Sequence, residues 1–97
     1  MEKQVNINKL LSAVTKVFEC YIEEIQGQIR PSNVTDARTM ICGILKENGY
    51  ENQYVSDIIK RKPNNIASIA RRHKDFLSFD KKYNSKYNEV KNMGIYE

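Results

Sequence analysis

The 97-residue sequence has no tryptophan, only one histidine and two cysteines, and these scarcities exclude several classes of protein. One histidine and no Cys-x-x-Cys pair leave too few ligands for a structural zinc site. The chain also has no glycine-rich phosphate loop and no acid pair placed against the histidine. We therefore expect no enzyme, no cofactor and no metal.

Long hydrophobic runs are missing as well. No run approaches the ~20 apolar residues of a membrane span, and residues 1–10 lack the apolar core of a signal peptide. We therefore expect a cytoplasmic protein with no membrane partner. In a reducing cytosol Cys20 and Cys42 are expected to be plain thiols rather than a disulfide or a redox pair. Cys20 is expected to lie away from the apolar stripe of its helix.

Alternation of apolar and polar residues at period two is absent, so the fold is predicted to be all-α. Residues 1–97 are expected to form one domain with its core in 8–92, a bundle of five or six helices. Helical spacing of apolar residues predicts one helix from Asn6 or Asn8 to Gly27, further helices over 34–48, 52–60 and 64–78, and a last one capped by Asp80. Residues 92–97 are expected to fray.

Three features of these helices predict how they pack. Gly43 lacks a side chain and so is expected to permit a close crossing of two helices. His73 lies in the middle of an apolar face, which favours a partly buried structural histidine over a catalytic one. Tyr83 and Tyr87 repeat at helical spacing, and this stripe is either a lid on the core or an interface.

Negative charge is absent from residues 58–74, which hold six basic residues and no acid. Segments 1–30, 31–57 and 75–97 have net charges of 0, −2 and 0, so the overall excess of +4 comes from this stretch. It combines a turn with a helix that has one apolar and one polar, basic face. DNA-binding proteins that read the major groove present such a turn and helix.

Basic residues and asparagines gather around the expected start of this helix. Lys60, Arg61 and Lys62 precede it and are expected to contact phosphates, the alternative being an ordinary solvated surface. Asn64 and Asn65 are candidates for base contacts, because Asn pairs bidentately with adenine in the major groove. One of the two asparagines is instead expected to cap the helix.

Further candidates lie one to three turns along the same helix. Ser68 faces outward with Asn64 and is expected to reach base edges. Arg71 also faces outward, toward a base or a phosphate, whereas the more lateral Arg72 suits a phosphate. Asp75 would repel phosphates, so it either limits the contact to the first two turns or forms a salt bridge with one of the arginines.

Three short stretches resemble one known family: VTDARTM at 34–40, YVSDII at 54–59 and IARR at 69–72. They are similar to its basic loop entering a helix, the helix before its signature turn, and the body of its recognition helix. Together with the order of helices across 8–92, they resemble the C-terminal DNA-binding domain of the bacterial replication initiator DnaA. That domain is a helix-turn-helix fold related to the Trp repressor.

The resemblance implies a helix-turn-helix over about residues 52–78 and a role in DNA replication or transcription regulation. By analogy with the family's loop, Arg38 is expected to contact the DNA backbone or an adjacent minor groove, the alternative being a surface helix residue. The family's paired glycines are replaced by basic residues around Lys60 and Arg61. Its Asp-His-Thr-Thr stretch corresponds to residues 63–66, Pro-Asn-Asn-Ile. We expect a stand-alone relative with another target sequence or a partly lost site.

Two functions follow from these observations. The first is a non-enzymatic module that binds double-stranded DNA, acting as a homodimer or within a larger replication or regulatory complex, since one small module buries limited surface. The alternative is a helical protein-interaction or adaptor domain. In that case the basic turn binds an acidic partner and the Tyr83/Tyr87 stripe is the interface.

Overall fold

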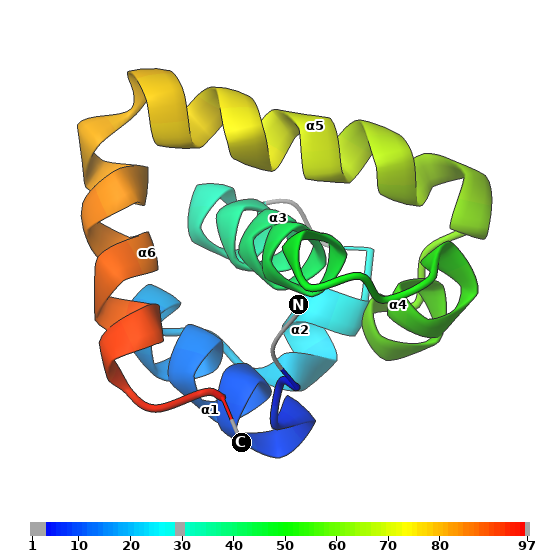
Figure 1. Cartoon of the computed structure of the whole chain (residues 1–97), viewed down its shortest axis with the longest axis horizontal. Helices are drawn as coiled ribbons and strands as arrows, with labels where there is room; N and C mark the ends of the chain where they lie inside the picture. Colours follow the sequence, from blue (N-terminus) through cyan, green and yellow to red (C-terminus); the bar gives the residue numbers. More distant parts are fainter. Residues whose placement is uncertain (1–3, 29–30, 97) are drawn as a thin grey trace.

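The computed structural model describes residues 4–28 and 31–96 and is all-α, as predicted (Figure 1). Its described part contains six helices: α1 (Ile7–Phe18), α2 (Ile22–Gln26), α3 (Ser32–Glu47), α4 (Asn52–Ile59), α5 (Pro63–Phe79) and α6 (Lys81–Asn92). Helices α3, α4 and α5 begin and end within one or two residues of their predicted bounds, and α6 begins directly after its predicted cap, Asp80. Within the described ranges, each helix is too short or too polar to cross a membrane.

Helix α3 is the centre of the molecule. Ten of its sixteen residues are buried, because apolar residues occupy several of its faces. Figure 1 shows α5 along one side of α3 and α1 with α2 on the opposite side, while α6 descends from the end of α5. Helix α5 therefore packs on α3, and it also contacts α4 and α6.

The prediction of one continuous helix from Asn6 or Asn8 to Gly27 is wrong, because the chain forms two helices there, α1 and α2. Glu19 adopts a left-handed conformation with φ of 54° and ends α1. Helix α2 then restarts with the Glu24 carboxylate accepting a hydrogen bond from the Tyr21 backbone N–H at 2.8 Å. The break turns Cys20 into the core, so the expected position of Cys20 away from the apolar side is also wrong. Ile25 joins the core by the same turn.

Helices α3 and α5 approach each other closely at Gly43, as predicted. A methyl group added at Gly43 would lie 2.0 Å from Cγ of His73 on α5. Nearby, the Cys42 thiol donates to the backbone carbonyl of Ile66 at 3.5 Å. Because Gly43 has no side chain, the His73 ring fills the space beside it.

The sequence predicts that residues 92–97 fray. This prediction is wrong for residues 92–96, and Glu97 lies outside the described residues. Ile95 is fully buried, and its carbonyl accepts a hydrogen bond from the Asn6 N–H at 2.7 Å. Val5 and Tyr96 pair beside it in an antiparallel bridge. The apolar side chains of Val5 and Ile95 anchor both ends of the described chain to the core.

Replacing Gly43 with Ala should destabilise the fold by about 1–3 kcal/mol, because the added methyl group overlaps the His73 ring and forces α3 and α5 apart. Chemical denaturation followed by circular dichroism measures this loss. Gly27→Ala is the milder comparison, since the added methyl group would meet the Glu23 carbonyl at 3.1 Å, a contact that a shift of a few tenths of an ångström relieves, and its φ of −88° suits any residue. Equal stability of Gly43→Ala and the unchanged protein would contradict the close packing.

Candidate nucleic-acid interface

The turn between α4 and α5 is defined by one left-handed residue and one proline. Lys60 ends α4 with φ of 57°, and Pro63 occupies the first turn of α5. Proline is suited to this place because its missing N–H would have no helical partner there. Helix α5 therefore starts before Asn64 and Asn65, and the prediction that one of them caps it is wrong.

The outward face of α5 is polar and exposed. Ile66 and His73 are buried on the inward side, as their spacing predicted. The exposed side chains of the outward side are Asn64, Asn65, Ser68, Arg71, Arg72 and Asp75. Helix α5 thus offers an exposed polar ridge, and Asn65, Ser68 and Arg72 lie on the flank of this ridge that is nearer to α3.

The three basic residues of the turn are placed differently from one another. Lys60 and Lys62 are exposed. Arg61 instead extends to the end of α2, where its Nη2 donates to the Gly27 carbonyl at 2.6 Å, and its Nη1 donates to the Lys60 carbonyl at 3.0 Å. The Ser56 hydroxyl also bonds to the carbonyl of Arg61. Arg61 therefore holds the turn against α2.

Arg38 is bound at the same end of α2 from the other side. It is only 7% exposed, so the alternative of a surface helix residue is wrong. Its Nε donates to the Ile25 carbonyl at 2.9 Å, and its Nη2 lies 3.5 Å from the Glu24 carbonyl. The last carbonyls of a helix attract cations, because they lack helical partners and carry the negative end of the helix dipole.

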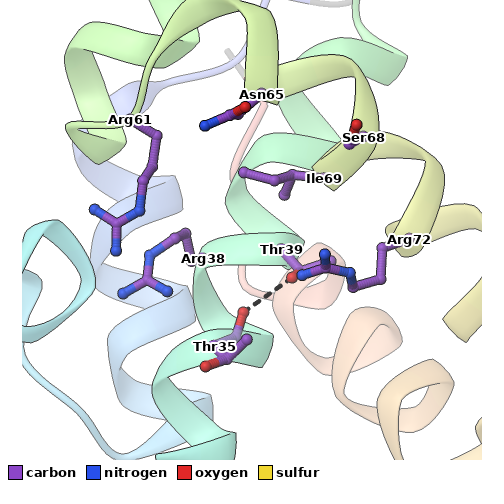
Figure 2. A pocket seen from close by; sticks show the side chains of 8 residues that line it. All are labelled: Thr35, Arg38, Thr39, Arg61, Asn65, Ser68, Ile69 and Arg72. Carbon is purple, nitrogen blue, oxygen red and sulfur yellow. Dashed lines mark hydrogen bonds between the residues drawn. The ribbon is translucent and has the colours of Figure 1, made fainter. Parts of the chain in front are cut away.

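A cleft of about 260 Å³ lies between α3 and α5, and we call it the α3–α5 cleft (Figure 2). It is lined by Thr35, Arg38 and Thr39 of α3, Arg61 of the turn, and Asn65, Ser68, Ile69 and Arg72 of α5. Five of the nine predicted contact residues therefore meet at one place. Sequence reasoning missed the two threonines, which lie four residues apart on α3 and are joined by a bond from the Thr39 hydroxyl to the Thr35 carbonyl at 2.9 Å.

The other four predicted residues lie outside this cleft. Lys60, Lys62 and Asn64 are exposed around the start of α5. Arg71 lines a second cleft of about 580 Å³, together with Lys46 of α3 and Lys74 of α5. Because residues 71 and 72 are separated by 100° around a helix, the neighbouring arginines belong to clefts on opposite flanks of the α5 ridge.

The floor of the second cleft contains a hydrogen-bonded chain centred on His73, which is fully buried. Its Nδ1 lies 2.6 Å from the Tyr83 hydroxyl and its Nε2 lies 3.2 Å from a carboxylate oxygen of Glu47. Tyr87 donates to the same carboxylate at 2.9 Å. Because an ionised carboxylate only accepts, Nε2 carries the hydrogen of this bond. The prediction of a buried structural histidine is confirmed.

Tyr83 is almost fully buried and is part of the core rather than of an interface. Burial, followed by nearby acidic groups, raises the pKa of the Tyr83 hydroxyl well above its ordinary value, so it remains a donor. Burial likewise raises the pKa of the Cys42 thiol to about 12, and both cysteines are free. Tyr83 therefore covers the core, whereas Tyr87 is half-buried beside Glu47, and the thiol of Cys42 stays protonated at neutral pH.

No protein-family model and no curated protein matches this chain. Within residues 4–28 and 31–96, no three His, Cys, Asp or Glu side chains are grouped so that they could hold a metal ion. The geometry of α5, its turn and the two clefts is thus the basis on which a function can be argued.

Replacing Glu47 with Gln should flatten the acid dependence of stability. Burial alone would raise the pKa of Glu47, but bonds from His73 and Tyr87 outweigh it, with the Lys91 charge contributing, and lower this pKa below its ordinary value of 4.5. A carboxyl with a lowered pKa adds stability above its unfolded pKa that is lost as the pH falls through its folded pKa. Denaturation between about pH 6 and pH 3 measures the effect.

The matched control is Glu89→Gln on the exposed side of α6, which leaves the His73 chain intact. Glu47→Gln should lose less stability on acidification than the unchanged protein, whereas Glu89→Gln should follow it. Parallel curves for Glu47→Gln and the unchanged protein would contradict a stabilising role for this carboxylate.

Proposed function

We propose that this chain binds double-stranded DNA, with α5 in the major groove and the preceding turn on the phosphate backbone. The observation that carries the proposal is the exposed outward side of α5, which bears no acid before Asp75 and is preceded by exposed Lys60 and Lys62. A helix of this kind, held by one face and polar on the other, is what helix-turn-helix proteins insert into DNA. In this proposal α4, the turn and α5 form a helix-turn-helix like that of the DnaA C-terminal domain.

The distribution of charge supports the same orientation. Lys60 and Lys62 lie at the start of α5, and Arg71 and Arg72 lie on its two flanks. The strands on either side of a major groove would place phosphates near such positions. Asp75 lies farther along the same side and would limit the contact to the part of α5 that precedes it.

The backbone conformation makes Lys60 a useful probe of the proposal. A non-glycine residue with φ near +57° costs roughly 1–2 kcal/mol relative to the right-handed region, and glycine is the residue that avoids this cost. Glu19 has a similar φ of 54°, so this conformation by itself does not mark a functional residue. A glycine at position 60 removes the charge and relieves the strain in one step.

The remaining candidates take separate roles in the proposal. Asn64, Asn65 and Ser68 are the side chains proposed to reach base edges from the first turns of α5. Arg38 and Arg61 position the turn through their bonds to the end of α2 and add positive charge behind it. Because one small module buries limited surface, we propose that it acts as a homodimer or within a larger replication or regulatory complex.

Removing two exposed lysines of the turn should weaken DNA binding and flatten its salt dependence. Each phosphate contact contributes about 0.9 to the slope of log affinity against log salt, so Lys60→Ala combined with Lys62→Ala should reduce the slope by about 1.8. Arg61 is left in place because it holds the fold. Fluorescence anisotropy with a random-sequence duplex between low and moderate salt measures the slope.

The matched control removes two exposed lysines of α1, Lys9 and Lys16, which lies on the side of α3 away from α5 (Figure 1). This variant has the same net charge as the turn variant and should keep the slope of the unchanged protein. Equal slopes for both double variants would contradict the proposed face. A lack of binding even at low salt would favour an adaptor domain whose basic turn binds an acidic protein.

Lys60→Gly separates binding from stability. It should leave the free energy of unfolding unchanged or raise it by up to about 1 kcal/mol, because glycine relieves the left-handed strain but increases the entropy of the unfolded chain. The same variant should bind DNA more weakly. Glu19→Gly is the control, since Glu19 has φ of 54° at the end of α1. If Lys60→Gly bound DNA as tightly as Glu19→Gly, a role for the Lys60 charge would be excluded.

A further inference from the structure

The α3–α5 cleft has the chemistry of an anion site. Three of its eight lining residues are arginines, three carry hydroxyl groups, one is an asparagine, and none is acidic. A concave surface whose walls carry charges of one sign concentrates the electrostatic field and attracts ions of the opposite sign. Its volume of about 260 Å³ is several times that of a water molecule, about 30 Å³, and admits a small oxyanion.

Two of the three arginines of the cleft are held in place before any ligand arrives. Arg38 and Arg61 are each bonded to backbone carbonyls at the end of α2. In Figure 2 the guanidinium group of Arg72 extends from α5 toward Thr39, and the amide of Asn65 lies on the opposite side of the opening. Because the guanidinium groups of Arg38 and Arg61 are already fixed, ordering them costs no further conformational entropy on binding.

We infer that the α3–α5 cleft binds one phosphate group, with Arg72 as its direct donor and Arg38 and Arg61 as its positive wall. A guanidinium group matches the oxygens of a phosphate with two parallel bonds. The phosphate belongs either to the DNA backbone or to a small phosphorylated molecule. Only the first source depends on the proposed function.

The neighbouring arginines of α5 provide the test. Arg72 lines the α3–α5 cleft, whereas Arg71 lines the second cleft, and both are exposed, so neither substitution should disturb folding. The full chain labelled with ¹⁵N is titrated with inorganic phosphate at constant ionic strength, with chloride and then acetate as the balancing salts. Shifts of the backbone amide signals of Asn65, Ser68 and Ile69 measure binding at the cleft.

The unchanged protein and Arg71→Gln should show saturable shifts with phosphate and none with chloride or acetate. Arg72→Gln should bind phosphate at least about tenfold more weakly, because it loses charge-assisted hydrogen bonds. No saturable shift, equal binding of acetate, or equal affinities of the two variants would overturn the inference.

Adding a DNA duplex to the phosphate-loaded protein distinguishes the two sources. Release of phosphate at duplex concentrations that saturate binding assigns the cleft to a DNA phosphate. A ternary complex in which phosphate stays bound assigns it to a small phosphorylated ligand. Phosphate binding by a chain that binds no duplex would refute the proposed function and leave the cleft assignment standing.

Discussion

The contact between Gly43 and His73 is the constraint on which the rest of the structure depends. Because position 43 has no side chain, the imidazole ring packs directly against α3, and α5 is held there by one face. The same ring bonds to Tyr83, which brings α6 over the core, and to Glu47 of α3. A single residue of α5 thus joins three helices from within. The opposite side of α5 needs no partner to hold it and remains available to a ligand.

A second constraint acts at the far end of the turn, where two arginines bind the last carbonyls of α2. Helix α2 has only five residues and would be marginal alone, since short helices depend on tertiary contacts. Arg38 and Arg61 supply those contacts while orienting the turn that leads into α5. The groups that stabilise the fold and the groups proposed to meet an anion are therefore partly the same. This overlap means that a loss of binding in an Arg61 variant would not by itself identify a ligand contact.

Sequence reasoning predicted helices α3 to α6 closely, because apolar residues at helical spacing record which face each helix buries. It joined α1 and α2, since the left-handed residue that separates them is Glu19 rather than a glycine. It located the basic segment from charge alone. It could not predict that Arg38 and Arg61 reach α2 or that Thr35 and Thr39 line the same cleft, because these contacts join residues far apart in the chain. Gly43 was informative because a glycine inside a helix lowers the stability of that helix, and a close helix crossing offsets this loss.

The pairing of Val5 with Tyr96 has a consequence for how this chain tolerates rearrangement. The pair adjoins the start of α1, because Asn6, the residue after Val5, caps that helix. A short covalent link could join the two paired segments, and the chain could then be opened at the Asn48-Gly49 turn. Such a circular permutation would change the order of the helices along the chain and preserve their packing. Sequence appended at either side of this pairing would emerge from the same region and leave the polar ridge of α5 uncovered.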